Sequence, residues 1–450
     1  MSGLAGVQVL VVGVGVSGLA AARVLAEEGA RVRVSERRPG SEVEGADAIG
    51  DLGVEVFWGG HDPSHLDGAD VVVASPGVPE HAPILREALH RGVPVWSELE
   101  VGARVCSAPY VAITGTNGKT TTTEMVAASM RESGMDAVAC GNIGYPFSLA
   151  AREGHAALAV EASSFQLRFH RSFRPRVSVL LNLSPDHLDW HGTLDAYRSA
   201  KARIFELQGP GDTHVGNRDD ASGARVSRGA PCALTWFRLG RPEEGEVGYE
   251  DGSLVSRTSE TRTELGAPAA GGAGFRADFA AAGAASLAFG IDAASVRRGI
   301  AGIRPLPHRG QVVATHDSIR FVDDSKATNP HAALAALQGL TDVVLIAGGL
   351  SKGVDLSPLA AATPSLAAVV SMGEAAPQIE ALFEGAVPVR RASSVEEAVT
   401  LAADLAPSGG TVLLAPACAS QDMFRDYRER GDRFADAARK LSHSQGARRG

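Results

Sequence analysis

The sequence predicts an α/β protein with three domains. The chain has 450 residues, and at roughly 150 residues per domain this length suggests about two to four of them. Short runs of β-branched, apolar residues alternate with segments of helical pattern, as in parallel sheets covered by helices. Two of the runs lead directly into glycine loops, which are typical of nucleotide-binding α/β domains.

The first domain is expected over residues 1–97. It contains four short apolar runs and a helical segment after the first of them. Strands are expected at residues 7–12, 31–35, 69–74 and 93–96, and the helix at residues 19–28. This alternation predicts a Rossmann-like parallel sheet.

A glycine loop separates the first strand from its helix. Gly13, Gly15 and Gly18 fit the pattern G-x-G-x-x-G. Such a loop allows a tight turn and a close approach to a diphosphate, which the helix N-terminus attracts. Glu36 follows the second strand, where dinucleotide-binding proteins place the acid that binds ribose. NAD, another nucleotide diphosphate such as a UDP-sugar, and a tight turn that binds nothing all fit this loop.

A second loop is more specific. It spans residues 114–120, follows an apolar strand at residues 110–113, and ends in the Gly-Lys-Thr of a P-loop. Ile113 stands where the pattern G-x-x-x-x-G-K-[ST] has its first glycine, so the loop is a variant. Its backbone N–H groups can wrap phosphate oxygens, Lys119 can neutralise phosphate charge, and Thr120 can ligate Mg²⁺. A second nucleotide-binding loop favours a two-nucleotide enzyme over a simple dehydrogenase.

Further polar side chains follow the P-loop. Glu161 comes directly after a strand expected at residues 156–160. A carboxylate at the C-terminal end of such a strand points into the ligand crevice, and Mg²⁺ prefers oxygen ligands. Asp186 and His187 follow the next strand and could also bind metal, although a surface histidine in a capped loop is the commoner case. Lys201 lies on an expected helix, where lysine is usually a solvated charge.

The second domain is expected over residues 98–305 and the third over residues 306–450. Residues 209–274 are rich in Gly, Asp, Glu, Arg and Ser and are expected to form a small, mostly antiparallel region with loops. An alanine-rich helix is expected at residues 279–289. The third domain has a doubly wound pattern, with strands expected at residues 320–322, 343–347, 367–371, 387–390 and 411–415. The polar residues from His443 onward are expected to be disordered.

Composition narrows the class of protein. The formal net charge is -9, which argues against nucleic-acid binding because that needs a basic face. The four cysteines show neither metal-ligand spacing nor a disulfide framework, as expected of reduced thiols in the cytoplasm. Neither a secretory signal nor a run of roughly 20 apolar residues is present, so no membrane association is expected.

Taken together, these segments resemble the Mur ligase superfamily. The matching pieces run through nearly the whole chain in the family's order. The most specific are Asp-Ser-Lys-Ala-Thr-Asn at residues 324–329 and Pro-Ala-Cys-Ala-Ser at residues 416–420. The others are residues 13–18, 75–77, 115–120, 141–144, 161–167, 186–189, 197–201 and 306–309.

The resemblance implies a fold and a reaction. The first domain would bind the UDP part of a substrate, the second ATP and two Mg²⁺ ions, and the third would close over both. By this resemblance, ATP would phosphorylate the carboxylate of UDP-N-acetylmuramoyl-L-alanine. The amine of D-glutamate would then attack the acyl phosphate, giving an amide, ADP and phosphate. A cytoplasmic monomer in peptidoglycan precursor synthesis is expected.

The resemblance also assigns roles to residues. The expected ATP site comprises Gly115, Thr116, Asn117, Gly118, Lys119, Thr120, Thr121, Arg309 and Asp324. Mg²⁺ would be held by Thr120, Glu161, His187 and Lys201. The UDP-linked substrate would contact Gly15, Val16, Ser17, Glu36, Arg37, Ser75, Pro76, Gly77 and Asn142, and D-glutamate would contact Lys326, Thr328, Ser420 and Tyr427. The expected catalytic residues are Lys119, Glu161, His187, Lys201, Lys326 and Lys352.

One of these roles depends on a modification. In the family, the lysine that matches Lys201 is carbamylated, which turns an ammonium into a carboxylate-like ligand. An unmodified lysine that faced Mg²⁺ would repel it. The resemblance therefore implies that Lys201 is anionic in the active enzyme.

The chain departs from the family pattern at several positions. Ala277 and Ala280 stand where the family usually has asparagines that bind the nucleotide base or ribose. Gln311 replaces a common acid, and Tyr427 replaces a common phenylalanine, which adds a hydroxyl that needs a partner. A sister ligase for another amino acid, a folylpolyglutamate-type ligase, an NAD-dependent dehydrogenase and an inactive nucleotide-binding scaffold are the alternatives.

Overall fold

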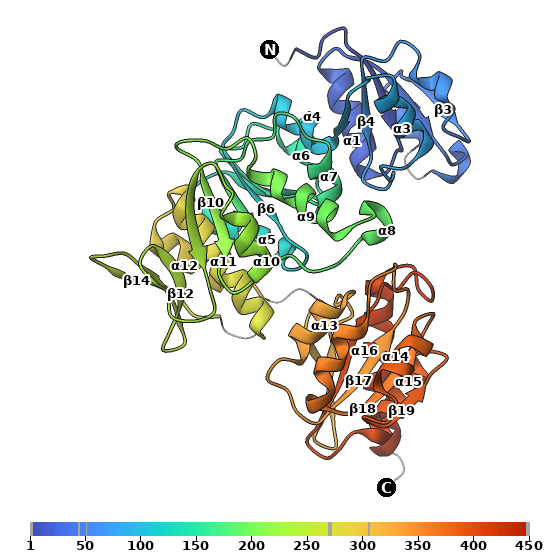
Figure 1. Cartoon of the computed structure of the whole chain (residues 1–450), viewed down its shortest axis with the longest axis vertical. Helices are drawn as coiled ribbons and strands as arrows, with labels where there is room; N and C mark the ends of the chain where they lie inside the picture. Colours follow the sequence, from blue (N-terminus) through green and yellow to red (C-terminus); the bar gives the residue numbers. More distant parts are fainter. Residues whose placement is uncertain (1–2, 44–45, 51, 269–271, 305–306, 447–450) are drawn as a thin grey trace. The chain divides into compact units, whose positions relative to one another are not determined.

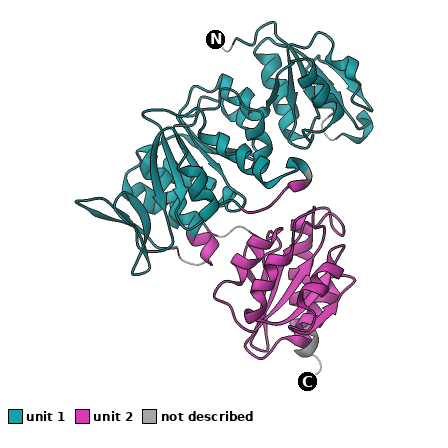
Figure 2. Cartoon of the chain, viewed as in Figure 1, with its two compact units in different colours: residues 1–183, 190–267, 277–303 teal, residues 184–189, 268–276, 304–450 magenta. Residues whose placement is uncertain are grey.

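The computed structural model describes residues 3–43, 46–50, 52–268, 272–304 and 307–446. They group into two compact units, shown in Figure 2. Unit 1 comprises residues 1–183, 190–267 and 277–303, and unit 2 comprises residues 184–189, 268–276 and 304–450. The expected boundary between residues 305 and 306 lies outside the described residues.

Unit 1 begins with a five-stranded parallel sheet in the order β3-β2-β1-β4-β5 (Figure 1). The order reverses between β1 and β4, and ligands bind at such a switch point in open α/β sheets. The strands are β1 (Gln8–Val12), β2 (Arg31–Glu36), β3 (Glu55–Trp58), β4 (Val71–Ala74) and β5 (Val95–Ser97). The helical segments are α1 (Val16–Glu27), η1 (Gly40–Glu42), α2 (Ala46–Gly50), η2 (Pro63–Leu66), α3 (Pro83–His90) and α4 (Glu98–Val105).

The second sheet of unit 1 has nine strands in the order β14-β13-β12-β11-β10-β9-β6-β8-β7. Its strands are β6 (Tyr110–Thr114), β7 (Ala137–Gly141), β8 (Ala157–Glu161), β9 (Val177–Leu180), β10 (Thr213–Asn217), β11 (Ala233–Phe237), β12 (Glu246–Glu250), β13 (Ser253–Arg257) and β14 (Arg262–Gly266). The helical segments are α5 (Lys119–Glu132), α6 (Phe147–Ala150), α7 (Ser164–Arg168), α8 (Leu188–His191), α9 (Leu194–Ala202), η3 (Arg203–Phe205), α10 (Ala221–Ser227), α11 (Ala273–Phe289) and α12 (Ala293–Ala301).

The region after residue 209 differs from its prediction. Strands β10 and β11 run parallel to β9 and extend the main sheet, and only β12, β13 and β14 pair antiparallel. The short helix α10 makes the crossover between β10 and β11, and the side chain of Asp220 caps its N-terminus. The expectation of a mostly antiparallel region was therefore wrong for the first two strands, because a seven-residue polar crossover helix resembles a loop in sequence.

Unit 2 contains a six-stranded sheet in the order β15-β16-β20-β17-β18-β19, in which only the pairing of β15 with β16 is antiparallel. The strands are β15 (Gln311–His316), β16 (Ile319–Asp323), β17 (Val343–Gly348), β18 (Leu366–Met372), β19 (Val389–Arg391) and β20 (Thr411–Ala417). The helical segments are α13 (Pro330–Leu337), η4 (Ser357–Ser365), α14 (Ala376–Phe383), α15 (Val395–Leu405) and α16 (Tyr427–Gly446). Helix α16 runs through residues 443–446, which were expected to be disordered, and residues 447–450 lie outside the described residues.

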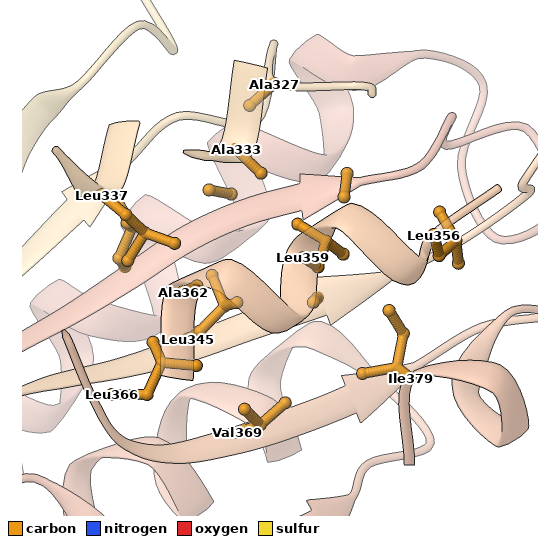
Figure 3. Close-up of a cluster of buried hydrophobic side chains, with 14 of the residues drawn as sticks. Ala327, Ala333, Leu337, Leu345, Leu356, Leu359, Ala362, Leu366, Val369 and Ile379 are labelled. Atoms are coloured by element: carbon orange, nitrogen blue, oxygen red, sulfur yellow. The ribbon is translucent and has the colours of Figure 1, made fainter. Parts of the chain in front are cut away.

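Alternate residues of the central strands of unit 2 enter two different cores. Leu345 and Leu413 belong to one buried cluster, whereas Val344 and Val412 belong to the other. This is the period of two expected of strands covered on both faces. Figure 3 shows the first cluster, in which Leu337, Leu359 and Ile379 cover the sheet from α13, η4 and α14. Among the described residues, no helix is both long and apolar enough to cross a membrane.

Candidate active site

The P-loop joins β6 to the N-terminus of α5. Gly118 has a φ of 88° and caps the helix, and a Cβ there would overlap with the buried carboxylate of Asp278. The Lys119 ammonium donates to the backbone oxygens of Gly115 and Thr116, at 2.9 Å each. The Thr121 hydroxyl is buried and has no hydrogen-bond partner within the described part of the chain. The loop therefore presents a lysine and a helix N-terminus to one spot, which suits an anion.

Glu161 lies beside this loop at the end of β8 and is only 2% exposed. One carboxylate oxygen accepts from the Thr120 hydroxyl at 2.8 Å, and the other accepts from the Asn142 amide at 2.9 Å. Three expected site residues from separate segments thus meet here. Over the described ranges, no three His, Cys, Asp or Glu side chains cluster closely enough to hold a metal ion. The hydroxyl and carboxylate oxygens nevertheless suit Mg²⁺, which usually takes a few protein oxygens and completes its shell with phosphate and water.

Lys201 is not a solvated surface lysine. It lies on α9, is 2% exposed, and donates to the backbone oxygen of Gly115 at 2.7 Å. Its Nζ lies 4.8 Å from the centre of the Tyr197 ring, and the Tyr197 hydroxyl lies 2.9 Å from the Thr116 hydroxyl. Helix α9 therefore brings a buried amine against the P-loop.

Asn182, just beyond β9, holds the P-loop from the other side. Its side-chain oxygen accepts from the Asn117 N–H at 2.9 Å, and its backbone oxygen accepts from the Thr116 N–H at 3.0 Å. The sequence places Asn182 at a strand end but does not indicate this role. Asp278 was likewise visible only as part of a departure from the family pattern. In both cases the partner lies in a distant segment.

The first glycine loop is held by a neighbouring serine. The Ser75 hydroxyl donates to the Gly13 backbone oxygen at 2.6 Å, and a Cβ at Gly18 would overlap with that same oxygen. Gly15, in contrast, has open space where a side chain would project. The other expected substrate residues of this sheet lie near its surface, namely the exposed Val16, Arg37 and Gly77 and the partly exposed Ser17 and Pro76.

Glu36 serves the same loop at the end of β2. Its carboxylate accepts from the Val14 N–H at 2.8 Å and from the Arg38 guanidinium at 3.0 Å. Burial alone would raise the pKa of Glu36, but these hydrogen bonds and the Arg38 charge outweigh it and lower the pKa to about 2. The carboxylate is therefore charged at neutral pH and orders the loop.

In unit 2, two acids follow β16 with different partners. Asp323 is 1% exposed and bonds the His308 ring at 2.6 Å. Asp324 lies beside Arg309, and burial raises its pKa to about 7 although the arginine opposes this. The nearby charge of Asp323 also raises the pKa of Asp324. Arg309 and Asp324 are thus close together, as expected of two residues of one nucleotide site.

The two most specific motifs of unit 2 meet at a buried arginine. Arg430, on α16, is fully buried and donates to the Ser325 hydroxyl at 3.0 Å and the Ser325 backbone oxygen at 2.8 Å. It also donates to the backbone oxygens of Cys418 and Ala419, at 3.2 and 3.3 Å. Arg430 therefore joins residues 324–329 to residues 416–420. The sequence does not indicate this role, because an arginine on a polar helix is expected to be exposed to solvent.

All four expected D-glutamate residues lie around this junction. The Ser420 hydroxyl is buried and has no hydrogen-bond partner among the residues that the structure describes. The Lys326 ammonium lies 3.8 Å from the centre of the Tyr427 ring. The Thr328 N–H donates to the Lys326 backbone oxygen at 2.8 Å. A buried hydroxyl without a partner is costly, so its presence favours a site that a ligand completes.

Lys352 and His187 also belong to unit 2. Lys352 has a φ of 53°. Its loop pairs with residues 416–420, because Leu350 and Ala419 each donate an N–H to the backbone oxygen of the other at 2.9 Å. His187 has a φ of 53°, and its Nε2 lies 3.8 Å from Oδ2 of Asp186. The same carboxylate oxygen accepts from the Asn329 side-chain amide at 3.3 Å. The structure thus places His187 in a different unit from the other expected magnesium ligands.

The first two sheets each carry a glycine loop of the kind that binds nucleotides. The third sheet carries Lys326 and the buried hydroxyl of Ser420, which has no partner within the described chain. Together these features define a multidomain nucleotide-dependent enzyme. Comparison with known families agrees in all three parts. Residues 7–97 match the Mur ligase MurD-like N-terminal domain, residues 113–251 the Mur ligase middle domain, and residues 308–418 the Mur ligase glutamate ligase domain. The chain belongs to the Mur ligase family, whose members are ATP-dependent.

Individual relatives extend the match over nearly the full length. UDP-N-acetylmuramoylalanine–D-glutamate ligase of Frankia casuarinae is 45% identical, covering 97% of this chain and 94% of that protein. The enzyme of the same name from Salinibacter ruber is 42% identical, covering 94% and 96%. The crystal structure of MurF ligase from Thermotoga maritima in complex with ADP has the same fold, with a TM-score of 0.59, 17% identity, and coverage of 91% and 95%.

Proposed function

We propose that this protein is an ATP-dependent ligase that adds D-glutamate to UDP-N-acetylmuramoyl-L-alanine through an acyl phosphate, in peptidoglycan precursor synthesis. The observation that carries the proposal is the near full-length likeness to D-glutamate ligases, at 45% identity for the Frankia casuarinae enzyme. The P-loop geometry supports the ATP-dependent step. The junction of residues 324–329 with residues 416–420 supports an amino-acid pocket in unit 2.

The chemistry requires activation of a carboxylate, which is a poor electrophile at neutral pH. Transfer of the γ-phosphoryl group forms a bond from carboxylate oxygen to phosphorus and releases ADP. The Lys119 ammonium and the N-terminus of α5 stabilise the negative charge on the phosphates. The amine of D-glutamate then attacks the acyl carbon, losing a proton as the C–N bond forms, and inorganic phosphate leaves with the C–O bond electrons.

Thr120 and Glu161 would hold Mg²⁺ beside these phosphates. The ion, when bound, neutralises phosphate charge and orients the phosphoryl group. On the strength of the family resemblance, Lys201 in carbamylated form and His187 are each proposed as further magnesium ligands. Glu161 has a second partner in Asn142, so its carboxylate is oriented before any ligand arrives.

The substrates are assigned to different sheets. The loop at Gly15, with Val16, Ser17, Glu36, Arg37, Ser75, Pro76 and Gly77, would bind the UDP part. Arg309 and Asp324 would contact ATP, and Lys352 would steady the acyl phosphate. Lys326, Thr328, Ser420 and Tyr427 would bind D-glutamate. We assign the activity to a monomer in the cytoplasm, where ATP and UDP-linked precursors are available.

An ADP-release assay with UDP-N-acetylmuramoyl-L-alanine and a panel of amino acids tests the proposal. We expect release to depend on D-glutamate and to be far slower with L-glutamate, which controls for charge and size. Equal or faster turnover with L-lysine or meso-diaminopimelate would assign the chain to a sister activity instead.

A further inference from the structure

Tyr427 stands between two cations in unit 2. The Lys326 ammonium lies 3.8 Å from the centre of its ring. The Arg428 Nε donates to its hydroxyl at 3.4 Å, and the Arg428 guanidinium carbon lies 5.7 Å from the ring centre. One aromatic side chain thus contacts a lysine through its face and an arginine through its hydroxyl.

Hydrogen bonds hold the backbone of Tyr427 in place. Its backbone oxygen accepts from the Ser325 hydroxyl at 2.7 Å, and the buried Arg430 donates to the same serine. These contacts tie the first turn of α16 to the loop that carries Lys326. The backbone of Tyr427 therefore cannot move away from this loop unless a buried hydrogen-bond network breaks.

The acid that precedes Tyr427 is Asp426, whose charge acts on Arg428 although its carboxylate is hydrogen-bonded elsewhere. The Asp426 carboxylate accepts from the backbone N–H groups of Arg428 and Glu429, at 2.9 and 3.0 Å, and so caps the helix. In the described part of the chain, the Arg428 guanidinium forms no salt bridge. Burial raises the pKa of the Tyr427 hydroxyl, but Lys326 and Arg428 outweigh it and leave the pKa below its ordinary value. The Tyr427 hydroxyl therefore lies within the influence of both cations.

We propose that Arg428, held by the Tyr427 hydroxyl, is a second carboxylate-binding group of the amino-acid pocket, beside Lys326. The inference rests on the proposed function, because D-glutamate carries two carboxylates. One lysine cannot neutralise both of them, and the hydroxyls of Thr328 and Ser420 donate hydrogen bonds but carry no charge. A guanidinium matches a carboxylate with two parallel donors.

The hydroxyl is the part of Tyr427 that makes this arrangement possible. A phenylalanine ring would present the same face to Lys326, but it could not accept from Arg428. Without that bond, a long exposed arginine side chain samples many rotamers and is seldom in place. Tyr427 is thus a positioning residue for Arg428, and the pair favours an amino acid with an anionic side chain over its amide.

Four variants test the proposal in the full-length protein: Tyr427→Phe, Arg428→Gln, the two combined, and Arg428→Lys. Arg425→Gln is the matched control, because Arg425 is an exposed arginine of the same region that pairs with Glu429. The assay measures ADP release against D-glutamate and D-glutamine concentration, with ATP and the UDP-linked substrate saturating.

We expect Tyr427→Phe and Arg428→Gln each to raise the KM for D-glutamate about three- to tenfold, with little change in kcat. The double variant should be no worse than Arg428→Gln, because the hydroxyl acts through the arginine. Arg428→Lys should keep part of the affinity, and Arg425→Gln should behave as wild type. The preference for D-glutamate over D-glutamine should narrow in Arg428→Gln, whereas a folding defect would reduce both activities equally.

An unchanged KM for D-glutamate in Arg428→Gln would overturn the inference, and additive effects in the double variant would overturn the positioning role of Tyr427. Failure of the proposed function gives a different result. In that case the wild-type protein itself would not release ADP in response to D-glutamate, whatever the variants do.

Discussion

Gly15 and Gly18 lie three residues apart in one loop, yet an added side chain would meet very different surroundings. At Gly18 it would overlap with the backbone of Gly13, whereas at Gly15 it would enter open space. Gly15 also has a φ of -71°, which any residue adopts. The fold therefore requires a glycine at position 18, and a close-lying ligand is the reason left for a glycine at position 15.

Gly15→Val tests this distinction. We expect the variant to fold and to unfold within a few degrees of the wild-type midpoint, because the added atoms meet no neighbour. Binding of the UDP-linked substrate should weaken by about tenfold or more, while ATP binding should be unchanged. Titration calorimetry with each ligand measures both affinities. Loss of ATP binding with retention of the UDP-linked substrate would reverse the assignment of the two loops.

Lys201 supports a second prediction at this scale. Its amine is buried against the P-loop, so an added carbamate would place oxygens beside the proposed phosphate and Mg²⁺ site. Lys201→Ala should lose nearly all ligase activity and remain folded, since a helix accepts alanine readily. Lys201→Arg should lose as much, because it keeps the positive charge.

A small carboxylic acid added to the assay should restore part of the activity of Lys201→Ala and little of that of Lys201→Arg. Near-normal turnover by Lys201→Arg would show that the residue acts as a simple cation. Mass spectrometry of the intact wild-type protein, kept in bicarbonate, offers an independent check on the carbamate.

Among the elements, β9, β10 and α10 enclose a polar layer around His214. The ring is fully buried, with Nδ1 2.7 Å from the Ser178 hydroxyl and Nε2 2.9 Å from the Ser227 hydroxyl. Burial lowers the pKa of His214 to about 3. The folded protein therefore keeps this histidine neutral at pH values where the unfolded chain, with a pKa of about 6.5, is protonated.

This shift predicts an acid-sensitive stability. The contribution of His214 is fully present above pH ~6.5 and is lost as the pH falls toward 3, because only the unfolded state takes up the proton. Between pH 7 and 5 the loss amounts to about 2 kcal/mol. Urea unfolding of the wild type and of His214→Gln at pH 7 and at pH 5 isolates the contribution of His214. The variant should lose less free energy of unfolding than the wild type when the pH is lowered. An equal loss in both proteins would contradict the assigned pKa.

At the element scale, the buried strands were predictable, whereas two of the edge strands were missed. Strands such as β17 and β20 form continuous apolar runs because helices cover both faces. The edge strands β3 and β15 were missed, since their apolar runs are short and none of their residues is fully buried. The direction of β10 and β11 depends on the length of a crossover, which composition does not report.

The candidate site was predictable where its residues follow strands or lie in glycine loops. Glu161, Lys119 and Thr120 belong to such segments, and the structure brings them together. Arg430 and Asp278 could not be found in this way. Arg430 bonds a serine 105 residues earlier in the chain, and a lone arginine on a polar helix carries no signal of burial. Pairing between distant segments, rather than local pattern, decides such roles.

For the whole molecule, the two units each have apolar cores of their own. The clusters around Leu345 and Val344 lie in unit 2, and those around Val11 and Leu158 lie in unit 1. Separate cores predict separate cooperative transitions. The P-loop belongs to unit 1, whereas only Arg309 and Asp324 of the proposed ATP site belong to unit 2, so ATP should stabilise unit 1 more.

Differential scanning calorimetry should therefore show two transitions. A nucleotide concentration 100 times its Kd should stabilise one of them by about 2.7 kcal/mol and shift the other by less. In Lys119→Ala the shift should disappear while both transitions remain. A single transition that moves as a whole with ATP would show that the units unfold together.

The Ser420 hydroxyl is an energetically unfavourable feature of the folded protein. It is buried, and across the described ranges no donor or acceptor satisfies it. Leaving such a group unsatisfied costs about 1–3 kcal/mol. Ligase activity should therefore favour serine at position 420, whereas the stability of the free protein should favour alanine. Ser420→Ala should raise the unfolding midpoint of the free protein and also the KM for D-glutamate, and thermal melts beside steady-state assays measure the two effects. If both effects are seen, the serine is retained at a cost to the resting fold, because the proposed substrate would complete a hydrogen-bond network that the chain leaves unfinished.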